Sequence, residues 1–294
     1  ECQLPEQDAN TPDRNKIPYS RGFMSSEDFA PPARPTTATK RSFPGARAIG
    51  ALILREMATS YGRSPGGYLW AVLEPIGGIA VMTVVFSAFL RSPGLGENFP
   101  IFYATGMLPF VMYVGLQGKI ASALNFSKPL LAYPTVTFVD AIFGRFILDV
   151  MTQLLVSYII FGGIMLIYET RTTLDFPLIF ESFALAALLG LGLGTLTCYA
   201  FTRFPLAQRA WGIITRPLFI ISCIFYLFDT IPEPYRSYLW YNPLVHVVGL
   251  MREGFYPEYD AYYVSRIYVL GISLVSLALG LLLLRRYHAE LMHR

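Results

Sequence analysis

The 294-residue sequence has little charge for its length, and it has few cysteines and histidines. Charged residues make up 15%, well below the roughly 25% of soluble domains, whereas hydrophobic residues make up 54%. The three cysteines and three histidines show no metal-ligand or redox spacing, so we expect no metal site. The net charge is only +3, and we expect no nucleic-acid partner. These shortages favour one compact membrane domain over a soluble one.

The segment 1–45 lacks a continuous apolar stretch and is rich in Pro, Thr, Ser, Arg and Asp. Such a segment cannot bury enough apolar surface to offset the entropy lost on ordering. We therefore expect a disordered cytoplasmic tail and no signal peptide, with the first span acting as the targeting signal. Residues 46–294 are then the membrane domain.

Six apolar segments are each close to the ~20 residues needed to cross a bilayer. They lie at about 69–90, 101–123, 146–168, 179–201, 211–228 and 266–284. An even number of spans places both termini on one side. That side carries 18 Lys and Arg against 5 on the other, so both termini are predicted to be cytoplasmic.

A further segment, 47–63, has the pattern of an amphipathic helix. Its apolar side chains fall at helical spacing on one face: Ile49, Leu52, Ile53, Met57 and Tyr61. We expect this helix to lie in the headgroup region with that face toward lipid. The alternative is a packed helix of a soluble subdomain.

The segment 229–251 is apolar and aromatic but interrupted by prolines. Each piece is too short to cross, and broken helices at membrane depth are tolerated only where protein or a water-filled cavity lines them. We expect a re-entrant helical hairpin that enters from the outer side between the fifth and sixth spans, with breaks at Pro232, Asn242 and Pro243.

The chain lacks the G-x-x-x-x-G-K-[S/T] motif that binds nucleotide phosphates. We therefore expect no enzyme activity and no cofactor in this chain. An energy-coupled role would require a partner that holds ATP and Mg²⁺.

Three stretches, taken in order, resemble the ABC type-2 permease family. They are LREMATSYGRSPGGYLWAVLEP (54–75), GMLPFVMYVGLQGKIASALNFSKPLLAYPTVTF (106–138) and SCIFYLFDTIPEPYRSYLWYNPLVHVVGLMREGFYP (222–257). The matches cover nearly all of 47–285 at the family's spacing. The third stretch most resembles the capsular-polysaccharide branch.

This resemblance implies an all-α homodimeric channel in the bacterial inner membrane, with two cytoplasmic ABC ATPase subunits. It implies export of a lipid-linked, acidic capsular polysaccharide, with a periplasmic co-polymerase and an outer-membrane exporter as partners. O-antigen, teichoic-acid and drug exporters of the same family are the alternatives. A membrane-embedded glycosyl- or acyltransferase is disfavoured, because the inner loops are short and poor in Asp and Glu.

The cytoplasmic loop Asn125–Pro134 is the predicted coupling element, with a plain connector as the alternative. The residues expected to couple to the ATPase are Arg55, Asn125, Lys128, Pro129 and Pro134. At the foot of the third span, Arg145 and Asp149 are spaced i, i+4 and are expected to form an intrahelical ion pair.

Aromatic residues make up 15% of the chain and gather toward the outer half. They fit either an interfacial aromatic belt or a lining on which sugar rings stack, and the sequence leaves both open. The predicted substrate path comprises Trp70, Phe86, Phe89, Tyr113, Tyr226 and Phe228, with the outer cations Arg91, Arg236 and Arg252. Alternatively, Arg252 together with Glu253 holds the hairpin in place.

Overall fold

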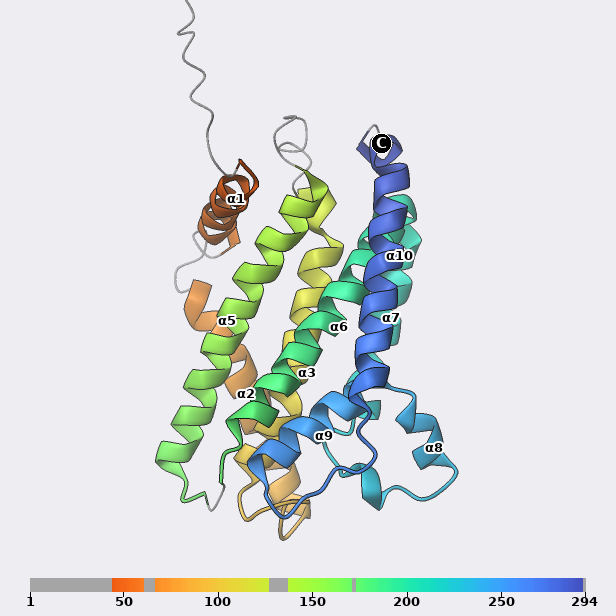
Figure 1. The fold of residues 1–294 in the computed structure, drawn as a ribbon. Coiled ribbons are helices and arrows are strands. Elements are labelled where there is room, and N and C mark those ends of the chain that lie inside the picture. The colour runs from red at the N-terminus through yellow and green to blue at the C-terminus, as the bar shows by residue number, and fades with distance from the viewer. Residues whose placement is uncertain (1–43, 61–66, 127–136, 171–172, 293–294) are drawn as a thin grey trace, which may run out of the picture. The chain divides into compact units, whose positions relative to one another are not determined.

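A computed structural model describes residues 44–60, 67–126, 137–170 and 173–292 (Figure 1). The predicted tail lies almost wholly outside these residues. Within them all regular structure is helical, as expected. Five helices are long and apolar enough to cross a membrane: α2 (Gly67–Phe89), α3 (Phe99–Ala121), α5 (Phe138–Ile167), α6 (Phe176–Arg203) and α10 (Arg266–Met292).

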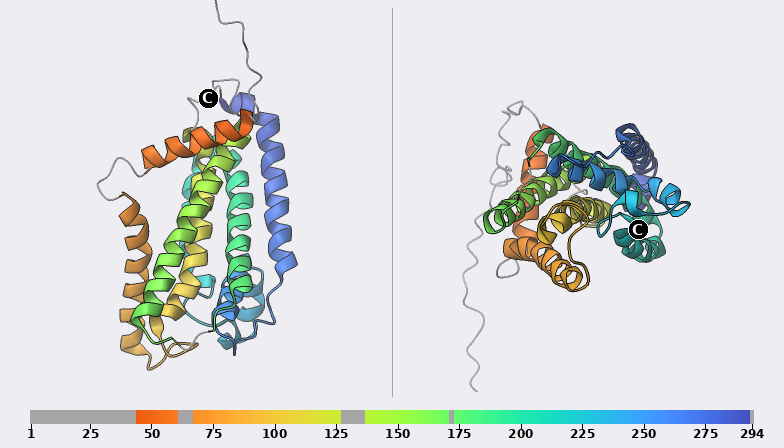
Figure 2. Two further views of the ribbon diagram at one scale, coloured as in Figure 1. Left: turned by 60° about the vertical axis from the view of Figure 1, so that its left-hand side comes forward. Right: turned by 90° about the horizontal axis from the view of Figure 1, so that it is seen from below.

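The fifth predicted span corresponds in part to α7 (Pro205–Ile221), which has 17 residues and is about 26 Å long. α6 and α10 run in the same direction, and α7 returns the chain between them (Figures 1 and 2). The predicted boundaries, 211–228, are displaced toward the C-terminus. Pro205 opens the helix at a position that proline favours, and Cys223 leaves the helical region with a φ of 58°.

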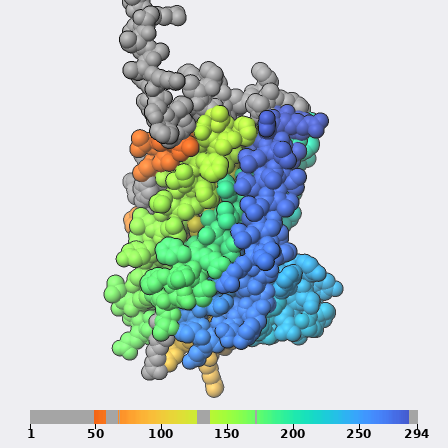
Figure 3. Space-filling view, in the orientation of Figure 1, coloured from red at the N-terminus to blue at the C-terminus, as the bar shows by residue number. Residues whose placement is uncertain are grey.

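The two ends of the bundle differ. One end, here the α1 end, holds α1 (Pro44–Ser60), the end of α3, the start of α5 and the last turn of α10. α1 lies across the bundle axis there (Figure 2). The other end, here the α8 end, holds the 3₁₀ turn η1 (Phe228–Thr230), α8 (Tyr235–Trp240) and α9 (Pro243–Phe255). Figure 3 shows this segment as a lobe beside the foot of α10.

The core forms around α6, which packs against α3, α9 and α10. Glycines allow this close approach. A Cβ at Gly192 would lie 2.3 Å from the carbonyl oxygen of Ser273 in α10, and one at Gly194 would lie 2.9 Å from Cβ of Ile120 in α3. Small residues let transmembrane backbones pack tightly. α6 is therefore enclosed from both sides.

α5 begins well before the predicted position 146. Thr137 and Asp140 form a capping box: the Asp140 amide donates to Thr137 Oγ1 at 3.2 Å, and the Thr137 amide donates to Asp140 Oδ2 at 2.9 Å. This reciprocal pair satisfies free amides of the first turn. The helix thus extends toward the α1 end and carries Arg145 inside it rather than at its start.

Among the helices that run along the bundle, α2 and α7 are the least enclosed by the rest of the protein. Among the described side chains of α7 none is buried, and most of those in the apolar part of α2 are exposed or half-buried. Their exposed apolar side chains include Val84, Phe89, Leu206, Ile213 and Ile220. These two helices therefore offer apolar surface to lipid or to another protein.

Candidate functional site

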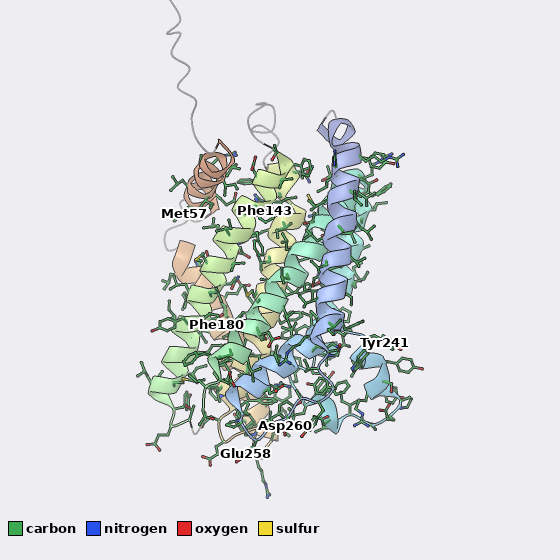
Figure 4. All side chains as sticks on the ribbon, viewed as in Figure 1. Met57, Phe143, Phe180, Tyr241, Glu258 and Asp260 are labelled. Atoms are coloured by element: carbon green, nitrogen blue, oxygen red, sulfur yellow. The ribbon has the colours of Figure 1, made fainter. Side chains whose placement is uncertain are left out.

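A hollow of about 360 Å³ lies beside α8 at the α8 end. Two predicted path residues, Phe228 and Arg236, line it together with Glu233, Ser237, Trp240 and Tyr241. Figure 4 labels Tyr241 on the outward side of this segment. The structure thus brings a cation, a carboxylate, a hydroxyl and aromatic rings to one open surface.

The charged rim of this hollow is ordered by Glu233. Arg236 Nε donates to Glu233 Oε1 at 2.9 Å, and Ser237 Oγ donates to Glu233 Oε2 at 2.7 Å. The bonds from Ser237 and Arg236 lower the pKa of Glu233 below its usual value. Among the described residues none accepts a hydrogen bond from the two terminal guanidinium nitrogens of Arg236. That edge of the guanidinium can therefore meet an anionic group from outside.

The aromatic part of the hollow is mostly engaged by the protein. Trp240 stacks on Tyr268 with centroids 5.1 Å apart, and its Nε1 donates to the carbonyl of Tyr263 at 3.0 Å. Phe228 is buried against Tyr263 at 4.1 Å. Tyr241, by contrast, is 67% exposed. Tyr241 is therefore the ring with most free surface in the hollow.

Two further tyrosines, Tyr235 and Tyr238, are exposed on α8. With Tyr241 they are spaced three residues apart, so they follow one side of the short helix. The sequence analysis did not single out this spacing, although it was visible in YRSYLWY.

Arg252 lies inside the protein rather than on a path. Its side chain is fully buried, with NH1 donating to the carbonyl of Tyr226 at 2.9 Å and NH2 to that of Ile224 at 2.8 Å. The guanidinium carbon lies 4.4 Å from the centroid of the Phe102 ring. Arg252 thus ties α9 to the turn after α7 and to α3. Of the two alternatives for this residue, the geometry supports the one in which it holds the hairpin.

Asn242 and His246 fix the other contacts of α9. Asn242 accepts the Leu244 amide at 3.1 Å and donates to the carbonyl of Ile221 at 3.1 Å. His246 accepts the Ser265 amide at Nδ1, so its Nε2 donates to the carbonyl of Trp240 at 2.8 Å. Two of the predicted hairpin residues begin α9: Asn242 is its N-cap and Pro243 is its first residue. The third, Pro232, is exposed and lies before α8.

The remaining predicted path residues do not form one lining within a protomer. Trp70 and Phe89 are exposed on α2, and Arg91 is exposed just after it. Phe86 is half-buried and stacks on Phe225 at 5.5 Å, and Tyr113 is buried in the core. Tyr226 is half-buried. Exposed and enclosed rings are thus distributed over several helices.

A second polar cluster lies at the α1 end and was not predicted in this form. Arg145 NH2 of α5 pairs with Glu56 Oε1 of α1 at 3.2 Å, and its NH1 donates to the carbonyl of Lys119 at 2.7 Å and to Ser122 Oγ at 3.1 Å. The Phe126 ring covers the guanidinium at 4.3 Å. One buried cation thus joins α1, α3 and α5.

The predicted intrahelical pair between Arg145 and Asp149 is wrong in this state. Asp149 is buried and pairs instead with Lys119 of α3. Spacing along one helix makes neighbours of two residues, but Glu56 and Lys119 offer each of them a partner on another helix. A neighbouring bond, Gln117 Nε2 to Thr197 Oγ1 at 2.8 Å, links α3 to α6.

Two of the five predicted coupling residues, Arg55 and Asn125, lie near this cluster. Arg55 is half-buried with its guanidinium carbon 5.4 Å from the Phe126 ring, and Asn125 is exposed. Lys128, Pro129 and Pro134 lie outside the described residues. In the described part of the chain, no group of three or more His, Cys, Asp or Glu side chains is placed to hold a metal.

Comparison with known proteins agrees with this architecture. A family model described as ABC-2 type transporter matches residues 47–256. The polysialic acid transport protein KpsM of Escherichia coli is 32% identical over 237 residues, covering 81% of this chain and 92% of KpsM. The capsule polysaccharide export inner-membrane proteins CtrC of Neisseria meningitidis and BexB of Haemophilus influenzae are 26% and 25% identical, each covering 82% of this chain and 91% of the relative. With most of its length matched by the family model, the chain belongs to the ABC-2 type transporter family.

Proposed function

We propose that this chain is the inner-membrane permease subunit of a capsule polysaccharide exporter. The observation that carries the proposal is the match to proteins named for polysialic acid transport and for capsule polysaccharide export, along more than nine-tenths of their length. Since the sequence has no P-loop, ATP and Mg²⁺ belong to a separate ATPase subunit. A periplasmic co-polymerase and an outer-membrane exporter complete the route of the polymer.

The orientation follows from charge. The α1 end faces the cytoplasm, because the sequence places most Lys and Arg on that side. α7 acts as the fifth of six spans, since it returns the chain between two parallel helices. α8 and α9 enter the membrane from the outer side as a re-entrant pair. The buried surface of α9 supports this placement, because such irregular segments need protein around them.

The transporter is a homodimer whose subunits meet along α2 and α7. The support is that these are the least enclosed of the helices that run along the bundle. Cysteines at Val84 and Ile213, both exposed in the protomer, should crosslink between subunits in the membrane. Equal crosslinking from Leu274 of α10, an exposed apolar control on another helix, would count against this interface.

The hollow beside α8 is the outer part of the substrate path. A sugar carboxylate would meet the free edge of Arg236, and a sugar ring would pack on Tyr241. Arg–carboxylate contacts are directional and strong, whereas one exposed aromatic ring adds little, which suits a polymer that must slide. An acidic, lipid-linked polysaccharide is therefore the proposed substrate.

The function is tested by deleting the chain from its host. Surface polysaccharide per cell should disappear while polymer accumulates inside, because synthesis continues without export. Loss of polymer from both places would show a role in synthesis instead.

The path is tested with Arg236→Gln and Tyr241→Leu at matched permease abundance. Each should lower surface polysaccharide, and the Arg236 variant should also weaken the salt dependence of export. The control is Tyr262→Leu, since Tyr262 is 90% exposed and bonds only the nearby Asp260. If the control lowers export as much, the rings act as an interfacial belt.

A further inference from the structure

Arg145 occupies a buried position that is held by three different elements. Only 7% of its side chain is exposed, and its partners are Glu56 of α1, two groups at the end of α3 and the ring of Phe126. A buried cation needs a paired anion, because transfer out of water is costly. Glu56 supplies that anion from a helix that lies across the bundle.

Two atoms of this cluster are buried without a hydrogen-bond partner among the described residues. They are Nε of Arg145 and Oδ2 of Asp149. An unpartnered buried polar atom destabilises the state in which it occurs. The two residues are spaced i, i+4 on α5, where side chains are neighbours. Each side chain thus keeps unused bonding capacity in this state, and the i, i+4 spacing allows the two to pair after a change of rotamer.

We propose that Arg145 is a two-position switch that anchors α1 through Glu56 in the observed state and pairs with Asp149 when α1 moves away. The exchange keeps the buried charge balanced. Glu56 leaves with α1, while Lys119, whose side chain is 38% exposed, can turn toward water when Asp149 takes Arg145. The ends of α3 and α5 rearrange with it, because Arg145 also bonds the carbonyl of Lys119 and Ser122 Oγ.

The cluster lies where movement of the proposed ATPase could reach the bundle. Phe126 contacts both Arg55 and Arg145, and it is the last described residue at the start of the predicted coupling loop. α1 lies at the end of the bundle that faces the proposed ATPase. A displacement of α1 would therefore become a rearrangement inside the bundle. This use of the switch rests on the proposed function, but the exchange of partners does not.

The docked position of α1 can be reported by a disulfide. A Cβ placed on Gly144 of α5 lies 3.4 Å from Cβ of Leu52, close to the usual separation in disulfides. The reporter carries Leu52→Cys and Gly144→Cys in full-length permease whose own three cysteines are replaced by alanine. The rate of oxidative crosslinking in nanodiscs then measures how often α1 is docked.

Three variants in this reporter separate a switch from a merely structural cluster. Glu56→Gln should slow crosslinking by about tenfold, because Arg145 loses its anion on α1 and turns to Asp149. Asp149→Asn should leave crosslinking as fast or make it faster, because the competing position is lost. The double variant should crosslink at a rate closer to Asp149→Asn, since Lys119 and Ser122 still hold Arg145 on the docked side.

The proposal is overturned if Asp149→Asn slows crosslinking as Glu56→Gln does, if the two losses add in the double variant, or if Glu56→Gln has no effect. Glu74→Gln, an exposed carboxylate on α2, is the matched control and should change nothing. Should Glu56→Gln not give a monodisperse protein, Glu56→Asp keeps the charge and should give a smaller fall in the same direction. Crosslinking needs neither ATPase nor polymer, so a failed export assay would reject the proposed function and leave this result standing.

Discussion

The two buried arginines lie at opposite ends of the bundle and are held in different ways. Arg252, at the α8 end, donates to backbone carbonyls of Ile224 and Tyr226 and packs on Phe102. Arg145, at the α1 end, donates to one backbone carbonyl, that of Lys119, but its contact with α1 is made by the side-chain carboxylate of Glu56, on a helix lying across the bundle. Backbone carbonyls cannot leave without unfolding the chain, whereas a side-chain carboxylate can. The contacts of Arg252 at the α8 end are therefore fixed, here called the fixed joint, whereas the contact of Arg145 with α1 can break while the bundle stays folded.

The largest effect that tests this difference is on stability. Arg252→Met should destabilise the protein by about 3 kcal/mol, because two buried carbonyls lose a charged donor. Arg145→Met should cost less, since Glu56 can turn toward water. The midpoint of thermal unfolding in one detergent would measure both. A larger loss from the Arg145 variant would contradict the idea of a fixed joint at the α8 end.

A smaller effect is expected from the amide that joins α7 to α9. Asn242→Ala removes the cap of α9 and the bond to the carbonyl of Ile221, so a loss of about 1 kcal/mol is expected. Asn125→Ala, an exposed amide at the α1 end, is the control and should leave the melting midpoint unchanged. If both variants lost the same stability, the amide at the α8 end would be no more important for folding than the exposed amide at the α1 end.

The smallest effect concerns the exposed ion pair of Arg236 with Glu233, which contrasts with the buried pair of Arg145 with Glu56. Hydrogen bonds from Ser237 and Arg236 hold the pKa of Glu233 below its usual 4.5. A depressed pKa adds stability above the unfolded value, and this is lost as the pH falls through the lower, folded value. The Ser237 amide, which donates to Glu233, should therefore lose protection against hydrogen exchange, relative to the intrinsic rate at each pH, as the pH falls below 4.5. Glu233→Gln should abolish that pH dependence of the protection.

The sequence predicted the helical class and most spans, because long apolar segments are a local property. It misplaced the end of α7, since the turn at 222–228 is as apolar as the helix before it. It also misassigned Arg145, because its partner Glu56 is 89 residues away and no local spacing shows it. For Arg252 the sequence allowed two roles, in the substrate path or in holding the hairpin, and it could not show that the side chain is buried.

The candidate site was predictable in kind but not in arrangement. Aromatic enrichment pointed to the outer half, and Phe228 and Arg236 do lie in one hollow. The engagement of Trp240 with Tyr268, and the freedom of Tyr241, depend on how the chain folds back between α8 and α10. Contacts of that kind join segments by tertiary packing, which hydropathy and spacing do not encode.

The glycine face of α6 has a consequence for how the protein is made. α6 packs between α3, which leaves the ribosome before it, and α10, which leaves after it. Until α10 is inserted, the surface at Gly192 lacks the backbone of Ser273 that packs on it. Membrane insertion can therefore proceed helix by helix, but assembly of the core must wait until α10 has been made. A nascent chain stalled before Arg266 would leave that face of α6 without its partner.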